Sequence, residues 1–288
     1  MPLDYPNIVP QNNLRLPDAL TIKHGPAELL SRFVLESDKA TRERGVFARL
    51  RYDFDELLYL NQDRAARGDW YRLPNMFHPQ YSELTPENSY WIAGEDEYGE
   101  IVATQAGRIY FWPETTLEEE ARLMFYAGRE AGQRCAVTAA DAKSITGVVF
   151  YGGSVWVRPD FRKKQLAQIL PRMGRAYALA RWPVDWGISL VAPVLVDKGV
   201  AAGYGYKHVS YSVSYPGSPW GDIEFALVSL SALEAYEDFA AILAAGSSGF
   251  DGRSSSLVAA SNILEDKLTK ISLEGVFQGS SSLSYRVE

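Results

Sequence analysis

The sequence predicts an α/β (α+β) protein built on a mixed central sheet, and three observations support this fold class. Residues 90–103 contain two β-rich runs around an acidic turn, which is typical of a hairpin. Residues 147–157 form an apolar, β-branched run, after which the hydrophobic period becomes that of a helix over residues 166–180. Strand-like and helix-like segments then alternate up to residue 230, as expected when helices pack on a sheet.

The bulk composition is that of a globular protein. The chain has 288 residues, of which 47% are hydrophobic and 12% aromatic, and this argues against disorder. A formal net charge of −7 repels a polyanion over most of the surface, so we expect no nucleic-acid partner. The sequence has no run of about 18 apolar residues, and we expect no membrane span and no membrane partner.

Cysteine and histidine usage indicates a reducing compartment and argues against metal chemistry. The single cysteine, Cys135, cannot form an internal disulfide, and the first residues lack the regions of a signal peptide. Both features favour a soluble, cytoplasmic protein. The three histidines are scattered without metal-ligand spacing, so we expect no metal site.

The N-terminal quarter is predicted to be an arm followed by two helices. Residues 1–26 are rich in prolines and polar amides, and we expect an extended arm. Apolar residues at spacings of three and four between residues 27 and 67 predict two helices broken near Gly45. This pattern places Phe47 and Leu50 on a helical face.

A long loop precedes the hairpin, and a helix follows it. Residues 68–88 are rich in aromatic residues and prolines, which indicates a surface loop of the kind that often borders a binding site. A loop held by its own aromatic side chains is the alternative. After the hairpin, Thr115 or Thr116 is expected to cap a helix over residues 117–130, with glutamates in its first turn.

The C-terminal half continues with strands and helices. Residues 186–191 predict a buried strand and residues 194–202 a short helix. Residues 209–215 and 223–230 predict two strands that pair across a turn. A helix over about residues 231–244 then leads out of the sheet.

We divide the chain into three parts on these patterns. The first is the arm of residues 1–26, and the second is a main domain of residues 27–232. The third is a C-terminal helical extension, residues 233–288, with a flexible link at residues 246–256.

Positive charge is concentrated between Val155 and Trp182. This stretch has seven basic residues and one acidic residue, although the whole chain is acidic. Arg162, Lys163 and Lys164 lie where the strand passes into the helix, so their charge adds to that of the free amides at a helix N-terminus. The combination predicts a site for a pyrophosphate, and a solvated charged face is the alternative.

The segment from residue 155 to residue 167 resembles the acyl-CoA motif of the GNAT acetyltransferases, in which a strand is followed by Arg/Gln-x-x-Gly-x-Gly/Ala. Arg162 and Ala167 match the two ends of the motif, and Gln165 replaces its middle glycine. A glycine there lets the backbone approach phosphate closely, so the side chain of Gln165 must point away from the ligand.

Two further segments are similar to the same family and occur in its order. The hairpin at residues 90–103 resembles its second and third strands, and residues 205–207, Gly-Tyr-Lys, resemble its Gly-Phe-Lys signature. Together the three matches cover about residues 85–230, which we take as the core of the main domain.

The resemblance implies a mixed central sheet splayed between its fourth and fifth strands, with helices on both faces and helical additions at the N- and C-termini. It implies that acetyl-CoA, or another short acyl-CoA, binds in the gap. The backbone of the fourth strand would pair with pantetheine at Val155, Trp156 and Val157. The backbone amides of the following turn would hold the pyrophosphate: Arg162, Lys163, Lys164, Gln165, Leu166 and Ala167.

The resemblance also implies a tyrosine that protonates the departing thiolate. In the family this tyrosine often lies four residues before the Gly-Phe pair, a position that is Ala201 here, and a frequent asparagine upstream corresponds to Val194. We name Tyr204 as the candidate catalytic acid and expect Tyr206 to pack as the family's phenylalanine does. Three carboxylates near predicted strand ends remain alternatives for the general base: Glu100, Asp222 and Glu224.

Three functions follow from these patterns. The first is transfer of an acetyl or other short acyl group from CoA to a primary amine of a small molecule or peptide. The second is a non-catalytic acyl-CoA-binding or regulatory module that has lost its acid. The third is an interaction protein whose terminal additions form an oligomer interface, with a homodimer as the simplest assembly. We expect the loop at residues 68–88 and the C-terminal helices to shape the acceptor site.

Overall fold

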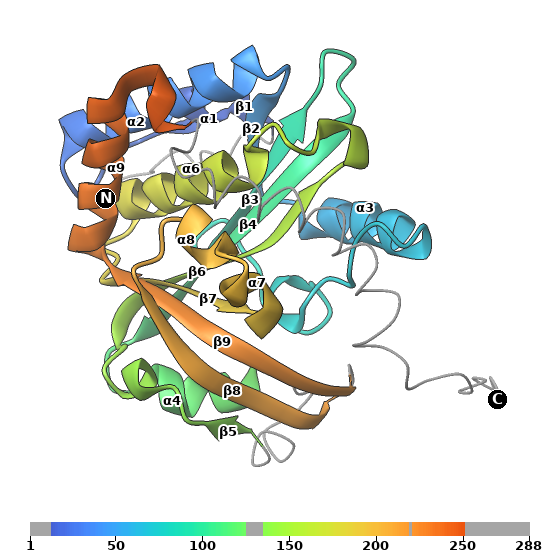
Figure 1. Ribbon diagram of the computed structural model, residues 1–288, viewed down its shortest axis with the longest axis vertical. Helices are drawn as coiled ribbons and strands as arrows, with labels where there is room; N and C mark the ends of the chain where they lie inside the picture. Colours follow the sequence, from blue (N-terminus) through green and yellow to red (C-terminus); the bar gives the residue numbers. More distant parts are fainter. Residues whose placement is uncertain (1–12, 125–134, 219–220, 251–288) are drawn as a thin grey trace, which may run out of the picture.

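The structure is a computed structural model, and it describes residues 13–124, 135–218 and 221–250. Within these residues lies a nine-stranded sheet with the strand order β1-β2-β3-β4-β6-β7-β9-β8-β5. Its strands run antiparallel except for the neighbours β6 and β7, which are parallel (Figure 1). The mixed sheet confirms the predicted fold class.

The N-terminal part contains two of the expected helices and two additional strands. Its elements are β1 (Leu14–Arg15), α1 (Leu16–Ala19), α2 (Ala27–Glu43), β2 (Phe47–Arg51) and α3 (Phe54–Ala66). Part of the predicted arm is therefore packed: β1 pairs with β2, and Leu16 is completely buried. Residues 1–12 lie outside the described residues.

The prediction of a helix around Phe47 and Leu50 was wrong, because these residues belong to β2. The helix α2 ends before Gly45, whose φ of 75° is left-handed and suits glycine. Beyond it Ala48 and Leu50 are buried and alternate with more exposed neighbours, which is the period of a strand. A spacing of three between Phe47 and Leu50 was compatible with both periods, and pairing of β2 with β3 favours the strand.

The middle of the chain contains the predicted hairpin and the predicted buried strand. Its elements are η1 (Asn75–Phe77), β3 (Ser89–Glu95), β4 (Ile101–Trp112), α4 (Leu117–Glu120), η2 (Ala121–Leu123), β5 (Ala136–Val137), η3 (Ala140–Lys143) and β6 (Gly147–Val157). Thr116 and Glu119 form a capping box at the start of α4, so Thr116 is the cap. Most of the predicted second half of this helix lies outside the described residues.

The C-terminal part follows the predicted alternation. Its elements are η4 (Pro159–Phe161), α6 (Leu166–Arg181), β7 (Trp186–Val191), α7 (Pro193–Asp197), α8 (Val200–Gly203), β8 (His208–Ser218), β9 (Gly221–Ser231), α9 (Ala232–Ala245) and η5 (Gly246–Gly249). Residues 251–288, which include most of the predicted extension and link, lie outside the described residues. None of the described helices is long and apolar enough to cross a membrane.

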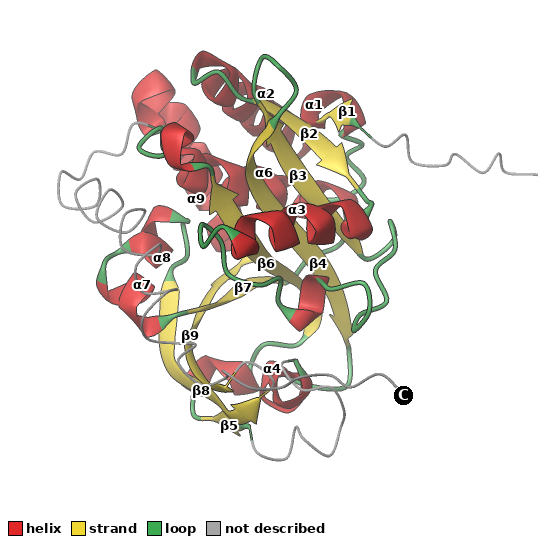
Figure 2. Cartoon of the chain, turned by 90° about the vertical axis from the view of Figure 1, so that its right-hand side faces the viewer, coloured by secondary structure: helices red, strands yellow, loops and turns green. Residues whose placement is uncertain are grey.

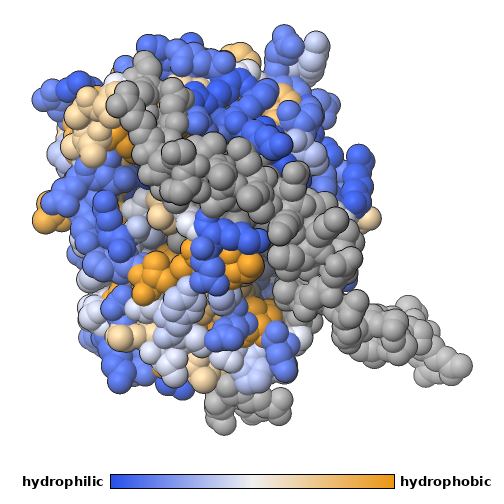
Figure 3. Space-filling model, viewed as in Figure 1, coloured by the Kyte–Doolittle hydropathy of each residue, from blue (hydrophilic) through white to orange (hydrophobic). Residues whose placement is uncertain are grey.

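Helices cover both faces of the sheet. On one face α2, α6 and α9 pack together, and the rings of Phe33 and Phe239 stack with their centroids 4.2 Å apart. On the other face α3 and the loop after it bury a second apolar cluster (Figure 2). Figure 3 shows hydrophilic side chains over α2 and apolar ones near the middle of that view, around α7, in which no residue is fully buried.

Candidate functional site

The strands β6 and β7 start as neighbours and then separate. They pair at three positions, of which Tyr151↔Ile188 is the last. In contrast, β4 pairs with β6 from Gly147 to Val157. From Gly152 to Val157, the edge of β6 that faces β7 therefore has no partner strand among the described residues (Figure 2). Counted from β2, these are the fourth and fifth strands of the sheet, so the predicted splay between them is confirmed.

A bulge interrupts β6 within its unpaired stretch. The register between β4 and β6 shifts between Thr104 and Ala106, and Ser154 has a φ of 50°. The hydroxyl of Thr104 donates to the carbonyl of Ser154 at 2.9 Å, which holds the bulge against β4. Bulges increase the local twist of a strand, and this one lies where β6 leaves β7.

A tight turn joins the outer end of β6 to α6. Lys163 and Gln165 have left-handed φ values of 65° and 60°, and Gln165 is the N-cap residue of α6. The side-chain oxygen of Gln165 accepts a hydrogen bond from Arg44 Nη2 at 2.7 Å. This contact directs the side chain toward the end of α2.

The amides of this turn are available to a ligand. In the part of the chain that the structure describes, the backbone N–H groups of residues 164–167 have no hydrogen-bond acceptor. They precede or begin a helix of 16 residues, so the positive end of the helix dipole lies at the same place. Free amides and a helix N-terminus together favour an anion.

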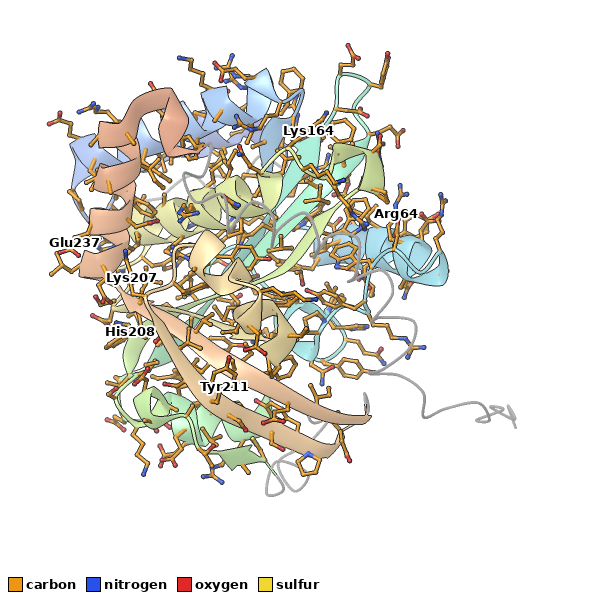
Figure 4. The ribbon with its side chains drawn as sticks, viewed as in Figure 1. Arg64, Lys164, Lys207, His208, Tyr211 and Glu237 are labelled. Carbon is orange, nitrogen blue, oxygen red and sulfur yellow. The ribbon has the colours of Figure 1, made fainter. Side chains whose placement is uncertain are left out.

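Cationic side chains lie around the same turn. Arg162 Nε donates to the carbonyl of Val157 at 3.3 Å, which brings its guanidinium back to the end of β6. Lys164 Nζ lies 4.0 Å from the centroid of the Phe161 ring and donates to the carbonyl of Arg44 at 3.4 Å. Lys163 is exposed. Figure 4 shows Lys164 at the N-terminal end of α6.

Sequence reasoning identified this turn but missed Arg44, which lies about 120 residues earlier in the chain. Its guanidinium adds a further cation at the helix N-terminus. No local pattern signals the contact, because it depends on how α2 packs against α6.

We call the gap between β6 and β7 the split, and its inner end is the point where the strands separate, at Tyr151 and Ile188. Buried aromatic hydroxyls line this inner end. Tyr206 is 9% exposed, which confirms that it packs in the core. Its hydroxyl donates to the carbonyl of Ile188 at 3.1 Å. Burial raises the pKa of both Tyr206 and Tyr151, the latter well above its ordinary value. Both side chains are therefore neutral at physiological pH.

Tyr204, the tyrosine named from the sequence, lies in the turn after α8. It is half-buried against the core, and its backbone carbonyl accepts a hydrogen bond from Arg175 Nη2 at 3.0 Å. Arg175 itself is 1% exposed on α6. Sequence reasoning counted this arginine only as part of the basic stretch, although a charged residue within a helix of buried alanines was a signal for a special role.

The three carboxylates considered as general bases lie apart from one another. Glu100 is exposed in the turn of the β3–β4 hairpin. Asp222 and Glu224 are exposed on the part of β9 that extends beyond its pairing with β7, which begins at Ala226.

The loop at residues 68–88 packs over the opposite face of β6. The Trp70 ring stacks on Trp156 with centroids 5.4 Å apart, and the fully buried Phe77 lies directly against Gly153. Arg64 of α3, which is labelled in Figure 4, has its guanidinium carbon 5.2 Å from the centroid of the Trp156 ring. The loop is thus a wall beside the split, anchored by its own aromatic side chains.

A shallow groove of about 150 Å³ continues along this wall. It is lined by loop residues together with residues of β4, the last residue of α4 and the segment that follows it. Its aromatic and charged side chains are Tyr81, Arg108, Tyr110, Trp112 and Glu120. Tyr110 connects the groove to the split, because its ring lies 6.5 Å from that of Tyr151.

Comparisons with known proteins add a distant structural similarity. No protein-family model and no curated protein matches the sequence. Among solved structures, NAA60 of Arabidopsis thaliana in complex with acetyl-CoA is similar at a TM-score of 0.41 and 12% identity, covering 65% of this chain and 99% of that chain. The aminoglycoside acetyltransferase AAC(6')-Ib, in complex with coenzyme A and kanamycin, gives 0.40 and 13%, covering 66% and 97%.

A GNAT superfamily phosphinothricin acetyltransferase from Sinorhizobium meliloti, in complex with AcCoA, is also similar. Its TM-score is 0.31 at 10% identity, covering 74% of this chain and 88% of that chain. The function proposed below therefore rests on the strand order and the split of this chain itself.

Proposed function

We propose that this chain is an acyl-CoA-dependent N-acyltransferase that transfers an acetyl or other short acyl group directly from CoA to a primary amine. The observation that carries the proposal is the parallel pair β6 and β7, which parts after three paired positions and opens onto a helix N-terminus with free amides and cations. The sheet order from β2 to β8 and the motif-like segment at residues 155–167 support the same assignment.

The CoA site follows from this geometry. The unpaired edge of β6 offers backbone groups to pantetheine at Val155, Trp156 and Val157, as a partner strand would. The turn offers its amides and cations to the pyrophosphate. The residues proposed for the pyrophosphate are Arg162, Lys163, Lys164, Gln165, Leu166 and Ala167.

We propose that the acceptor amine enters from the face of the sheet covered by α3, past the wall formed by residues 68–88. The groove beside this wall combines aromatic rings with Glu120 and with Arg108, whose guanidinium carbon lies 4.9 Å from the centroid of the Tyr110 ring. We propose that Glu120 and the aromatic rings receive the amine of a small molecule or peptide. Because an ammonium has no free electron pair, the amine must lose a proton before it attacks the thioester. Positioning of the two substrates across the split supplies a large part of the acceleration.

The proposed domain comprises residues 27–232, with its core at about residues 85–230 and residues 233–288 as an extension. The described part of this extension, α9, packs on α2 through Phe239. Cys135 is buried and burial raises its pKa to about 11, so its thiol is unreactive. A lone, protected thiol is consistent with the cytoplasmic location that we propose.

The charge of the turn provides the direct test. The double substitution Lys163→Glu/Lys164→Glu is expected to weaken CoA binding about a hundredfold, because two charge-assisted contacts become repulsive. Isothermal titration calorimetry with CoA measures the change. The matched control is Lys23→Glu/Lys143→Glu, which alters the net charge equally at exposed positions outside the turn. Equal affinities for the two double variants would remove the proposed phosphate site.

A non-catalytic acyl-CoA-binding module is the second candidate. It is favoured by Ala201 and Val194, which occupy positions where the resembled family often has a tyrosine and an asparagine. Release of free thiol from acetyl-CoA, measured across a panel of amines, separates the two functions. Binding of CoA without turnover of any amine would support the module, and turnover would support the transferase.

A further inference from the structure

The hydroxyl of Tyr206 lies at the point where the two parallel strands separate. It donates to the carbonyl of Ile188, the last residue of β7 that pairs with β6. A Cβ atom built on Gly152, the first unpaired residue of β6, would lie 3.4 Å from the same hydroxyl oxygen. One hydroxyl therefore contacts both strands at the inner end of the split.

The length of the unpaired stretch relates this hydroxyl to the anion site. From Val157 back to Gly152 there are five residue steps, about 17 Å at ~3.3 Å per residue. An extended pantetheine arm anchored by its pyrophosphate at the turn would run along this stretch. Its sulfur would then lie near Gly152, within reach of Tyr206.

A buried cation accompanies Tyr206. The guanidinium carbon of Arg175 lies 4.6 Å from the centroid of the Tyr206 ring, and the side chain is 1% exposed. Its Nη2 atom donates to the carbonyl of Tyr204, whereas its Nε and Nη1 atoms are buried without a hydrogen-bond partner among the described residues. A buried guanidinium with unsatisfied donors is costly, but it would stabilise a negative charge that forms on the adjacent phenol during reaction.

We infer that Tyr206, rather than Tyr204, is the catalytic acid that protonates the departing thiolate, with Arg175 as its positioning residue. This assignment rests on the proposed function. Tyr206 occupies the place of the phenylalanine in the resembled signature and supplies a hydroxyl that Ala201 lacks.

In the proposed step the amine attacks the thioester and CoA leaves as its thiol. The amine nitrogen forms a bond to the thioester carbon, the carbon–sulfur bond breaks, and its electron pair stays on sulfur. The O–H proton of Tyr206 passes from its hydrogen bond with Ile188 to that sulfur, which leaves a phenolate beside Arg175. The proton that the amine loses goes to water, and water returns a proton to the phenolate. The products are the amide and the free thiol of CoA.

The surroundings of Tyr206 suit an acid. Burial raises its pKa, and this effect exceeds the opposite effects of Arg175 and of a hydrogen bond with Ser189. The other titratable side chains that face it are Tyr90 of β3 and Tyr151 of β6. The hydroxyl thus keeps its proton through neutral pH, and transfer is expected to fail only as the pH rises past this raised pKa.

The test uses the full chain and CoA itself, so it requires no knowledge of the acceptor. The thiol of bound CoA is titrated by its ultraviolet thiolate absorbance in the wild type, in Tyr206→Phe and in the matched variant Tyr204→Phe. A hydrogen bond from Tyr206 stabilises the thiolate, so Tyr206→Phe is expected to raise the thiol pKa by about one unit, a tenfold change in proton affinity. Tyr204→Phe is expected to leave the pKa unchanged.

The possible results separate the acid from the binding site. Normal CoA binding with the same thiol pKa in the wild type and in Tyr206→Phe would overturn this assignment alone. A shift in Tyr204→Phe and none in Tyr206→Phe would also overturn it, in favour of Tyr204. If the wild type does not bind CoA, the proposed function fails and this assignment fails with it. With an amine that is accepted, Tyr206→Phe should lower kcat about a hundredfold and leave KM for acetyl-CoA unchanged.

Discussion

The two ends of the split between β6 and β7 differ in their chemical groups and in their exposure to solvent. At the outer end, free backbone amides and partly exposed cations surround a turn with left-handed residues. At the inner end, buried tyrosine hydroxyls lie beside the guanidinium of Arg175, two of whose nitrogens have no hydrogen-bond partner among the described residues. Solvent weakens the interactions between charges at the outer end, whereas the low dielectric constant of the core leaves them strong at the inner end. The outer end is therefore suited to hold a ligand, and the inner end to act on it.

The largest expected effect is on the free energy of unfolding, when Phe77 is removed beside the inner end of the split. Its ring is fully buried between Phe54 and Tyr151, with centroid distances of 6.2 and 5.7 Å. Phe77→Ala is expected to lower the free energy of unfolding by about 3–5 kcal/mol, because it leaves a cavity beside the split. Urea denaturation measures the loss. Phe111→Ala, at a position that is 56% exposed, is the control and should change the free energy by less than about 0.5 kcal/mol.

A smaller effect on stability is expected at the outer end of the split, from substitution of Gln165. The φ of 60° at Gln165 costs any residue with a Cβ about 1 kcal/mol, whereas glycine adopts it freely. Gln165→Gly and Gln165→Ala both lose the contact with Arg44. We therefore expect the glycine variant to be more stable than the alanine variant by about 1 kcal/mol in thermal unfolding. Equal stabilities would mean that the turn does not adopt this conformation.

The smallest expected effect is that of salt, which should change CoA binding at the outer end and leave the thiol pKa shift at the inner end unchanged. A tenfold increase in ionic strength is expected to raise the Kd for CoA about fivefold, because Lys163 and its neighbours lie at the surface, where salt screens charge. The change in thiol pKa caused by Tyr206→Phe should not respond to salt, since Tyr206 is buried. A CoA affinity that is independent of salt would contradict the role given to the outer cations.

The parts of the site that are continuous in sequence could be predicted, and the rest could not. The strand, turn and helix from Val155 to Ala167 form one segment, so periodicity and charge were sufficient to locate it. The strand β2 was missed because its five residues fit two periods, and only its pairing with β3 decides between them. Arg44 and Arg175 reach the two ends of the split from α2 and α6, and no local pattern shows where a helix face will point.

By itself the sequence determined the alternation of strands and helices, the hairpin and the basic turn, because each depends on neighbouring residues. Tertiary structure alone decided that β6 and β7 part after Tyr151 and that Tyr206 lies at that point. Its hydroxyl touches Ile188 and comes close to Gly152, which lie 18 and 54 positions away along the chain. Contacts over such separations arise from packing of the whole core, and local propensity does not encode them.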